Sequence, residues 1–162
     1  MLTRTPVSEI SVTIKTGDKV AVEGTNAGTK GEVYLGIGGR EFRLALPSQR
    51  PFIPNSTVTI VLGPRCNVEY NFYNALDCPN LYVEDLDVLP KYIRFQPVDI
   101  NDSWFVIEAK VTVNPGAAEK CYTKLSKFDG CWFSAKGTTI LHFRHLSDAD
   151  WFAVLNESIQ TP

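Results

Sequence analysis

Apolar and polar residues alternate with a period of two through most of this chain, which is the pattern of β-strands that bury one face. In the segment 10–14, Ile10, Val12 and Ile14 share one face, and the residues between them are polar. Further short strands are predicted at 33–37, 42–46, 58–62, 93–95, 121–123, 131–133 and 139–143. Glycine and proline residues separate these segments, so the pattern predicts an all-β fold, an antiparallel β-sandwich.

Residues 104–113 form the longest predicted strand, and its apolar alternation changes parity near Ile107 and Glu108. A β-bulge inserts one residue and turns the side chains that follow to the opposite face. We therefore expect a bulge at this point, so that Trp104 and Val111 both face the core.

One helix is predicted, near the C-terminus. Ser147 is a suitable N-cap, and Asp148 and Asp150 suit the positive end of the helix dipole. The apolar residues on one side of this helix are Trp151, Val154, Leu155 and Ile159. We expect a single domain over 1–162, in which a strand and this short helix occupy 135–162.

The composition excludes some classes of function. The chain has 162 residues and a formal net charge of −2, so a nucleic-acid partner has no electrostatic support. No apolar run approaches the ~20 residues of a membrane-spanning helix. The N-terminus lacks the apolar core of a signal peptide, so we expect either no export by that route, which favours the cytoplasm, or a leader outside this sequence.

The four cysteines, Cys66, Cys78, Cys121 and Cys131, lack the spacing of a zinc site. They are expected as buried thiols, or as the disulfides Cys66–Cys78 and Cys121–Cys131 if the compartment is oxidising.

Several short motifs follow one another along the chain. Residues 16–18 read Thr-Gly-Asp, residues 27–29 read Ala-Gly-Thr, and the strand at 33–37 follows. The later pieces are Phe52, Ile93, Asp99, Trp104, the strand 111–113 and the pair Cys131-Trp132. Over about residues 10–134, these pieces resemble the PLAT family, the lipoxygenase-homology domains named for polycystin, lipoxygenase and alpha-toxin.

The resemblance implies an eight-stranded β-sandwich of two four-stranded sheets, similar to C2 domains. It also implies a targeting module that faces lipid or protein and that is calcium-assisted in some members. Many members carry an aspartate directly after Ala-Gly-Thr, whereas this chain has Lys30 there.

Calcium is the first candidate ligand, because Ca²⁺ takes about six to eight oxygen ligands and glycine-rich loops expose backbone carbonyls. The candidate ligands at one end of the sandwich are Asp18, Glu23, Asn26, Gly28, Thr29, Asp99 and Asp102. The charge of Lys30 opposes a cation there. An alternative role for Asp18 is to brace a turn.

Membrane contact is the second candidate. Val20 and Val22 lie in one loop with Lys19 before them and Lys30 after them, and apolar tips beside basic residues suit anionic headgroups. The alternative is that both valines pack against a neighbouring loop. The segment 50–54 also reads as an apolar tip, but Phe52 is expected in the core.

Aromatic residues between asparagines are the third candidate. In the segment 67–74, Tyr70, Phe72 and Tyr73 are suited to stacking on a sugar. The same residues suit an ordinary strand with an aromatic core face. Trp104 and Trp132 are expected in the core for the same reason.

No catalytic centre is predicted. The histidines, His142 and His145, point to opposite faces of a strand, and no Gly-x-Ser-x-Gly, phosphate-loop or His-Glu-x-x-His motif occurs. We therefore expect a non-catalytic lipid- or protein-binding targeting module that docks on membranes through loops at one end of the sandwich. The alternatives are a protein-interaction or structural subunit that uses 67–74 and the terminal helix, and a carbohydrate-binding module.

Overall fold

Two antiparallel sheets form the fold, which the computed structural model describes for residues 3–18, 27–47, 49–68, 81–116, 119–125 and 130–143. In chain order, the strands within these residues are β1 (Ile10–Thr16), β2 (Glu32–Ile37), β3 (Arg40–Arg43), β4 (Thr57–Leu62), β5 (Tyr92–Gln96), β6 (Ser103–Val113), β7 (Lys120–Leu125), β8 (Cys131–Ser134) and β9 (Ile140–His142). A 3₁₀ turn at Val83–Asp85 precedes β5.

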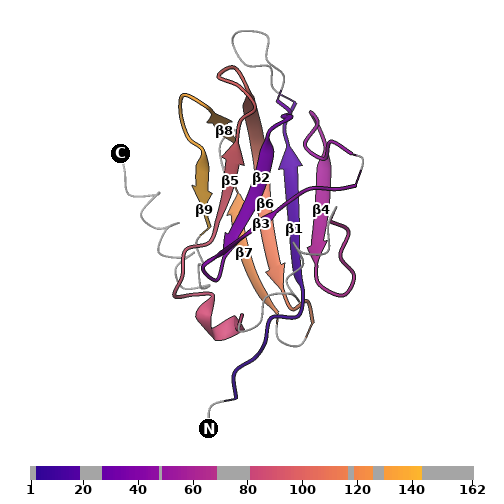
Figure 1. Cartoon of the computed structure of the whole chain (residues 1–162), viewed down its shortest axis with the longest axis vertical. Coiled ribbons are helices and arrows are strands. Elements are labelled where there is room, and N and C mark those ends of the chain that lie inside the picture. Colours follow the sequence, from indigo (N-terminus) through magenta and orange to yellow (C-terminus); the bar gives the residue numbers. More distant parts are fainter. Residues whose placement is uncertain are drawn as a thin grey trace, which may run out of the picture.

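The two sheets pack face to face as a sandwich (Figure 1). One sheet has the strand order β4-β1-β6-β7, with β8 also paired to β6, and the other has the order β3-β2-β5-β9. All of the pairings are antiparallel. The inward side chains of both sheets form one hydrophobic core, so the predicted all-β antiparallel sandwich is confirmed.

The strand β6 is long enough to pair with two strands along the same side. β7 pairs with its second half, from Glu108 to Val113, and β8 pairs with its first half, from Ser103 to Val106. The resemblance implied eight strands, whereas the described residues hold nine. The difference arises because β7 and β8 lie end to end in one position of the sheet.

The predicted bulge in β6 is confirmed. Lys15 of β1 lies opposite Glu108, but the next residue, Thr16, lies opposite Val106. Ile107 therefore has no partner of its own on β1, which resets the alternation. As a result, side chains on both sides of the bulge reach the core.

Trp104 lies at the centre of an aromatic cluster that joins the two sheets. Its ring centroid is 4.9 Å from that of Phe52, 5.2 Å from that of Phe133 and 6.0 Å from that of Phe95. Its indole N–H donates a hydrogen bond of 3.1 Å to the hydroxyl of Thr16. The expectation that Trp104 and Phe52 are core residues is confirmed, because their exposed fractions are 0% and 3%.

The expectation that Trp132 is a core residue is wrong. Cys131 and Phe133 of β8 pack toward the core, so the alternation of the strand turns Trp132 to the outer face of the sheet. There it is half-buried against Phe105, with ring centroids 4.8 Å apart. Phe133, which is fully buried, occupies the core position instead.

The suggested disulfide between Cys121 and Cys131 is excluded by the strand pairings. Cys121 lies opposite Thr112 on β6, whereas Cys131 lies opposite Val106. Six residues of strand separate these positions by about 20 Å. A disulfide requires Cα atoms within about 7 Å of each other. Cys78 lies outside the described residues.

Two predicted strands are shorter than expected. The strand expected over 42–46 ends at Arg43, although the N–H of Leu44 still donates to the carbonyl of Val33 at 2.8 Å. The strand expected over 139–143 spans only Ile140–His142. The predicted helix lies outside the described residues.

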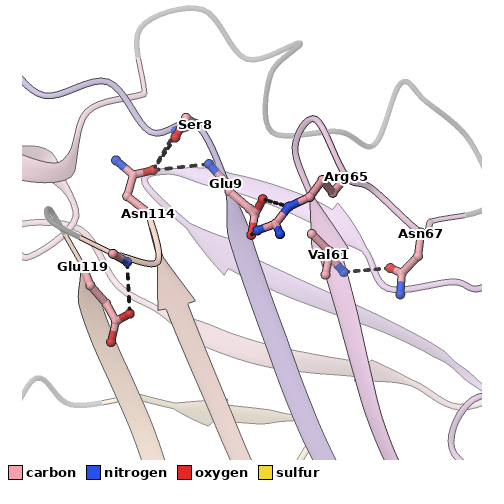
Figure 2. Close-up of polar contacts among 8 residues, drawn as sticks. Ser8, Glu9, Val61, Arg65, Asn67, Asn114 and Glu119 are labelled. Carbon is pink, nitrogen blue, oxygen red and sulfur yellow. Dashed lines mark hydrogen bonds and ion pairs between the residues drawn. The ribbon is translucent and has the colours of Figure 1, made fainter.

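Asn114 ties the N-terminal segment to the end of β6 (Figure 2). Its side-chain oxygen accepts hydrogen bonds from the N–H groups of Ser8 at 2.7 Å and Glu9 at 3.2 Å. Its side-chain nitrogen donates to the carbonyl of Pro6 at 2.9 Å. The backbone φ of Asn114 is 47°, in the left-handed region that asparagine tolerates better than most residues.

Asn67 covers the outer edge of β4 in a comparable way (Figure 2). Its side-chain oxygen accepts from the N–H of Val61 at 2.7 Å, and its side-chain nitrogen donates to the carbonyl of Thr59 at 2.9 Å. Its backbone N–H donates to the carbonyl of Val61 at 3.2 Å. One residue thus satisfies three backbone groups of an edge strand.

The substitution Asn114→Ala is expected to lower the free energy of unfolding by about 2–4 kcal/mol. It removes the acceptor for two backbone N–H groups and places a Cβ-bearing residue without a polar side chain in the left-handed region. Urea unfolding followed by tryptophan fluorescence measures this change.

Two further substitutions at the same position separate the two causes. Asn114→Gly relieves the backbone strain but still lacks the side chain, so its stability is expected to lie between those of the alanine variant and the unaltered protein. Asn114→Asp keeps the acceptor oxygen and is expected to lose least. An alanine variant as stable as the unaltered protein contradicts the assigned role.

Candidate functional site

Loops from both sheets meet at the end of the sandwich where β1 and β5 finish and β2 and β6 begin, the upper end in Figure 1. We call this end the rim and define it by residues 16–18, 27–31, 50–55 and 97–103. Each of these segments is held by hydrogen bonds to at least one of the others.

The Thr-Gly-Asp sequence at 16–18 is explained by the aromatic residues beneath it. The side chain of Thr16 points inward, and its hydroxyl oxygen accepts a hydrogen bond from the indole N–H of Trp104. Gly17 donates its N–H to the carbonyl of Phe105 at 2.9 Å, and a Cβ at this position would lie 2.3 Å from the Phe105 ring. Asp18 follows as an exposed residue at the end of β1.

The Ala-Gly-Thr sequence at 27–29 holds the segment that carries Phe52. The N–H of Thr29 donates to the carbonyl of Phe52 at 2.9 Å. A Cβ at Gly28 would lie 2.6 Å from the side chain of Pro54 and 2.8 Å from that same carbonyl. Glycine is therefore required at position 28 by the close approach of the two loops.

A hydrogen bond between Thr29 and Asp102 joins the early and late loops of the rim. The Thr29 hydroxyl lies 2.9 and 3.0 Å from the two carboxylate oxygens of Asp102. The same carboxylate accepts the N–H of Val98 at 3.1 Å, and the Thr29 oxygen accepts the N–H of Gly31 at 2.7 Å. The glycine-rich loop and the acids that precede Trp104 thus lie at the same end of the sandwich.

Asp99 braces the loop between β5 and β6. Its side-chain oxygen accepts the N–H of Asn101 at 2.7 Å and the N–H of Asp102 at 3.1 Å. Its backbone carbonyl also accepts the N–H of Asp102 at 3.2 Å. This is the local turn chemistry for which aspartate is favoured.

An open pocket of about 370 Å³ lies between these loops. Its charged lining residues are Lys30, Arg50, Asp99 and Asp102. The structure therefore brings together four of the predicted metal-site residues, which are Gly28, Thr29, Asp99 and Asp102. Asp18 belongs to the rim but not to the lining of this pocket.

Three apolar side chains stand exposed on two loops of the rim. Their exposed fractions are 53% for Ile53, 59% for Val98 and 62% for Ile100. Val98 and Ile100 alternate with polar residues directly after Pro97, so the sequence offers a signal for them, but that signal resembles the start of another strand. The burial of Phe52 explains why its neighbour Ile53 faces outward.

The acids that line the rim pocket are engaged in hydrogen bonds to the loops. Both side-chain oxygens of Asp102 and one of Asp99 accept hydrogen bonds from N–H and O–H donors, and Lys30 and Arg50 line the same pocket. Among the described residues, no group of three His, Cys, Asp or Glu side chains is placed to hold a metal. Glu23 and Asn26 lie outside these residues, so the calcium site stays a prediction.

The other predicted site residues fall largely outside the described part of the chain. These are Lys19, Val20 and Val22 of the membrane-binding set, and Tyr70, Phe72 and Tyr73 of the sugar-binding set. Lys30 is described and is exposed at the rim. Within the described residues, no helix is both long and apolar enough to span a membrane.

A second polar cluster covers the outer face of β2, β3 and β5. Arg94 donates two hydrogen bonds of 2.8 Å to Glu41 and lies 4.1 Å from the ring centroid of Tyr34. Tyr92 donates to the same Glu41 at 3.1 Å and lies 5.7 Å from the ring of His142. The hydrogen bond from Arg94 lowers the pKa of Glu41. The cluster satisfies its own polar groups, which indicates a bracing role.

The substitution Thr29→Val is expected to lower the free energy of unfolding by about 1–3 kcal/mol, because it removes the acceptor of the part-buried N–H of Gly31 and the hydroxyl that joins the two loops. Thermal melting and urea unfolding measure the loss. The matched control is Thr57→Val, at an exposed position on β4, which is expected to change stability by less than about 0.5 kcal/mol. Equal stability of the two variants contradicts the role of Thr29.

Comparison with known proteins gives likenesses to solved structures, and two of these are alpha-toxins. No protein-family model matches the sequence, and no curated protein matches it. Among solved structures, an alpha-toxin from Clostridium absonum matches with a TM-score of 0.54 and 23% identity, covering 88% of this chain and 32% of the toxin chain. An alpha-toxin of Clostridium perfringens, from the avian strain SWCP, matches with a TM-score of 0.57 and 20% identity, covering 87% and 32%.

The chain therefore spans about a third of the length of each toxin chain. At such identities the likeness concerns the fold alone. Alpha-toxin is one of the three proteins for which the PLAT family is named, so this likeness agrees with the resemblance found in the sequence. The chain has a PLAT/C2-like β-sandwich fold.

Proposed function

We propose that this domain is a non-catalytic targeting module that docks on a lipid bilayer through the rim. The observation that carries the proposal is the exposure of Ile53, Val98 and Ile100 on two adjacent loops at one end of the sandwich. Exposed apolar groups that gather at a surface in this way are typical of interaction sites. The fold shared with part of two alpha-toxins supports the choice of a targeting module.

Contacts within the protein hold the two loops that carry these side chains in place. Phe52 anchors one loop in the core, and the bond between Thr29 and Asp102 holds the other. Because the loops are already ordered by these contacts, docking loses little conformational entropy. Partial burial of three β-branched side chains contributes about 3–5 kcal/mol, which makes the attachment weak and reversible.

The lining of the rim pocket supports a binding role. Among the described residues, the lining includes no histidine or cysteine, and the carboxylates of Asp99 and Asp102 hold the loops in place. Lys19, Val20 and Val22 follow Asp18 of the rim directly in the sequence, so the proposal assigns them to the same docking surface. The interaction-subunit and sugar-binding alternatives both use 67–74, of which residues 69–74 lie outside the described residues, and the experiment below separates them from docking.

Co-sedimentation with lipid vesicles tests the proposal. The unaltered protein is expected to partition onto the vesicles, and Ile100→Ser and Val98→Ser are each expected to weaken partitioning about five- to ten-fold. The matched control is Val88→Ser, because Val88 is 81% exposed but lies outside the rim, next to the 3₁₀ turn. This control is expected to bind as the unaltered protein does.

Two results contradict the proposal. One is an absence of partitioning together with binding to glycans or to a protein partner. The other is an equal loss of partitioning in the rim variants and in the Val88→Ser control.

A further inference from the structure

Two basic side chains of the rim lie where two hollows adjoin. Lys30 and Arg50 are exposed, and both line the rim pocket and a neighbouring hollow that is also about 370 Å³ in volume. Thr29 and Phe52 line both hollows as well. Because Thr29 and Phe52 are fixed by their contacts, the two basic residues extend from a defined base.

Neither basic side chain is neutralised within the part of the chain that the structure describes. The third cation of these hollows, Arg43, forms an ion pair of 2.7 Å with Glu32. Lys30 and Arg50 form no such pair with any described residue. The two carboxylates that line the rim pocket with them, those of Asp99 and Asp102, accept hydrogen bonds from neutral donors of the loops. Two positive charges are therefore available to an anion that enters from outside.

The position of these charges relative to the apolar tips indicates the source of that anion. Ile53 and Val98 line the same pocket as Lys30 and Arg50 and are more than half exposed. When apolar tips enter a bilayer, long basic side chains beside them lie at the level of the headgroups. Phosphate is the anionic group that every phospholipid headgroup carries at that level, and it matches lysine and arginine in charge and hydrogen bonding.

Calcium-assisted docking would place an ion between the acids of the rim and the lipid, but the Asp102 carboxylate already accepts the Thr29 hydroxyl and the Val98 N–H, and the charge of Lys30 opposes a cation. The loops that such an ion would join are already joined by the hydrogen bond between Thr29 and Asp102. We infer that the rim binds the phosphate of an anionic phospholipid directly between Lys30 and Arg50, without calcium. This inference rests on the membrane docking proposed above.

The test compares vesicles of phosphatidylcholine alone with vesicles that also contain phosphatidylglycerol, each in EDTA and in millimolar calcium chloride. The unaltered protein is expected to prefer the anionic vesicles, to keep this preference in EDTA and to lose it as sodium chloride is raised. Lys30→Gln and Arg50→Gln are each expected to weaken partitioning onto anionic vesicles about five-fold, and the double variant about 25-fold.

Lys110→Gln is the matched control, since Lys110 is an exposed lysine of β6 away from the rim, and it is expected to bind as the unaltered protein does. Arg50→Lys keeps the charge and is expected to retain most of the binding. Thermal melting of every variant verifies that it is folded, as exposed positions lead us to expect.

Two outcomes overturn the inference and leave membrane docking in place. One is binding that disappears in EDTA and returns with calcium. The other is a loss in Ile100→Ser that the two basic-residue variants do not share. An unaltered protein that binds neither kind of vesicle overturns both the inference and the docking that it rests on.

Discussion

The burial of Trp104 is the constraint on which the rim depends. A buried indole contributes a large apolar surface, but its N–H must find an acceptor, and here the acceptor is the hydroxyl of Thr16 at the end of β1. The same ring contacts Phe52 and Phe133, which come from a loop and from β8. One side chain therefore fixes the end of β1, the start of β6 and the loop that carries the exposed Ile53. The geometry of the surface follows from the packing of the core beneath it.

Two rim loops each place a buried side chain directly before an exposed one. Phe52 is inserted into the core and Ile53 points outward. Thr29 is buried and bonded to Asp102, whereas Lys30 directly after it is exposed. Because the inward residue is fixed by close contacts, the direction of the outward residue is fixed as well. Loops held in this way are preorganised, and preorganised loops lose little conformational entropy when a ligand binds.

Much of the fold can be predicted from the sequence because alternation of period two reports burial directly. The change of parity near Ile107 located the bulge, since an inserted residue is the simplest way to keep Trp104 and Val111 on one side. The role of Trp132 could not be found in this way, because in a strand of four residues either parity looks apolar when it holds Cys131, Trp132 and Phe133. The exposure of Val98 and Ile100 was missed because no local pattern distinguishes apolar residues of a rigid loop from those of a strand. The division of one sheet position between β7 and β8 depends on the length of β6, which is a property of the assembled sheet.

The hydrogen bonds of Asn67 to the edge of β4 affect how neighbouring copies of the protein can associate. Proteins that gather on a bilayer reach high concentrations in two dimensions, where an uncovered strand would pair with that of a neighbour. Asn67 already satisfies the outward backbone groups of Thr59 and Val61 that such pairing would use. Along this stretch of β4, the Asn67 side chain disfavours pairing with a strand of another molecule, and under the membrane docking proposed above it would keep neighbouring copies separate.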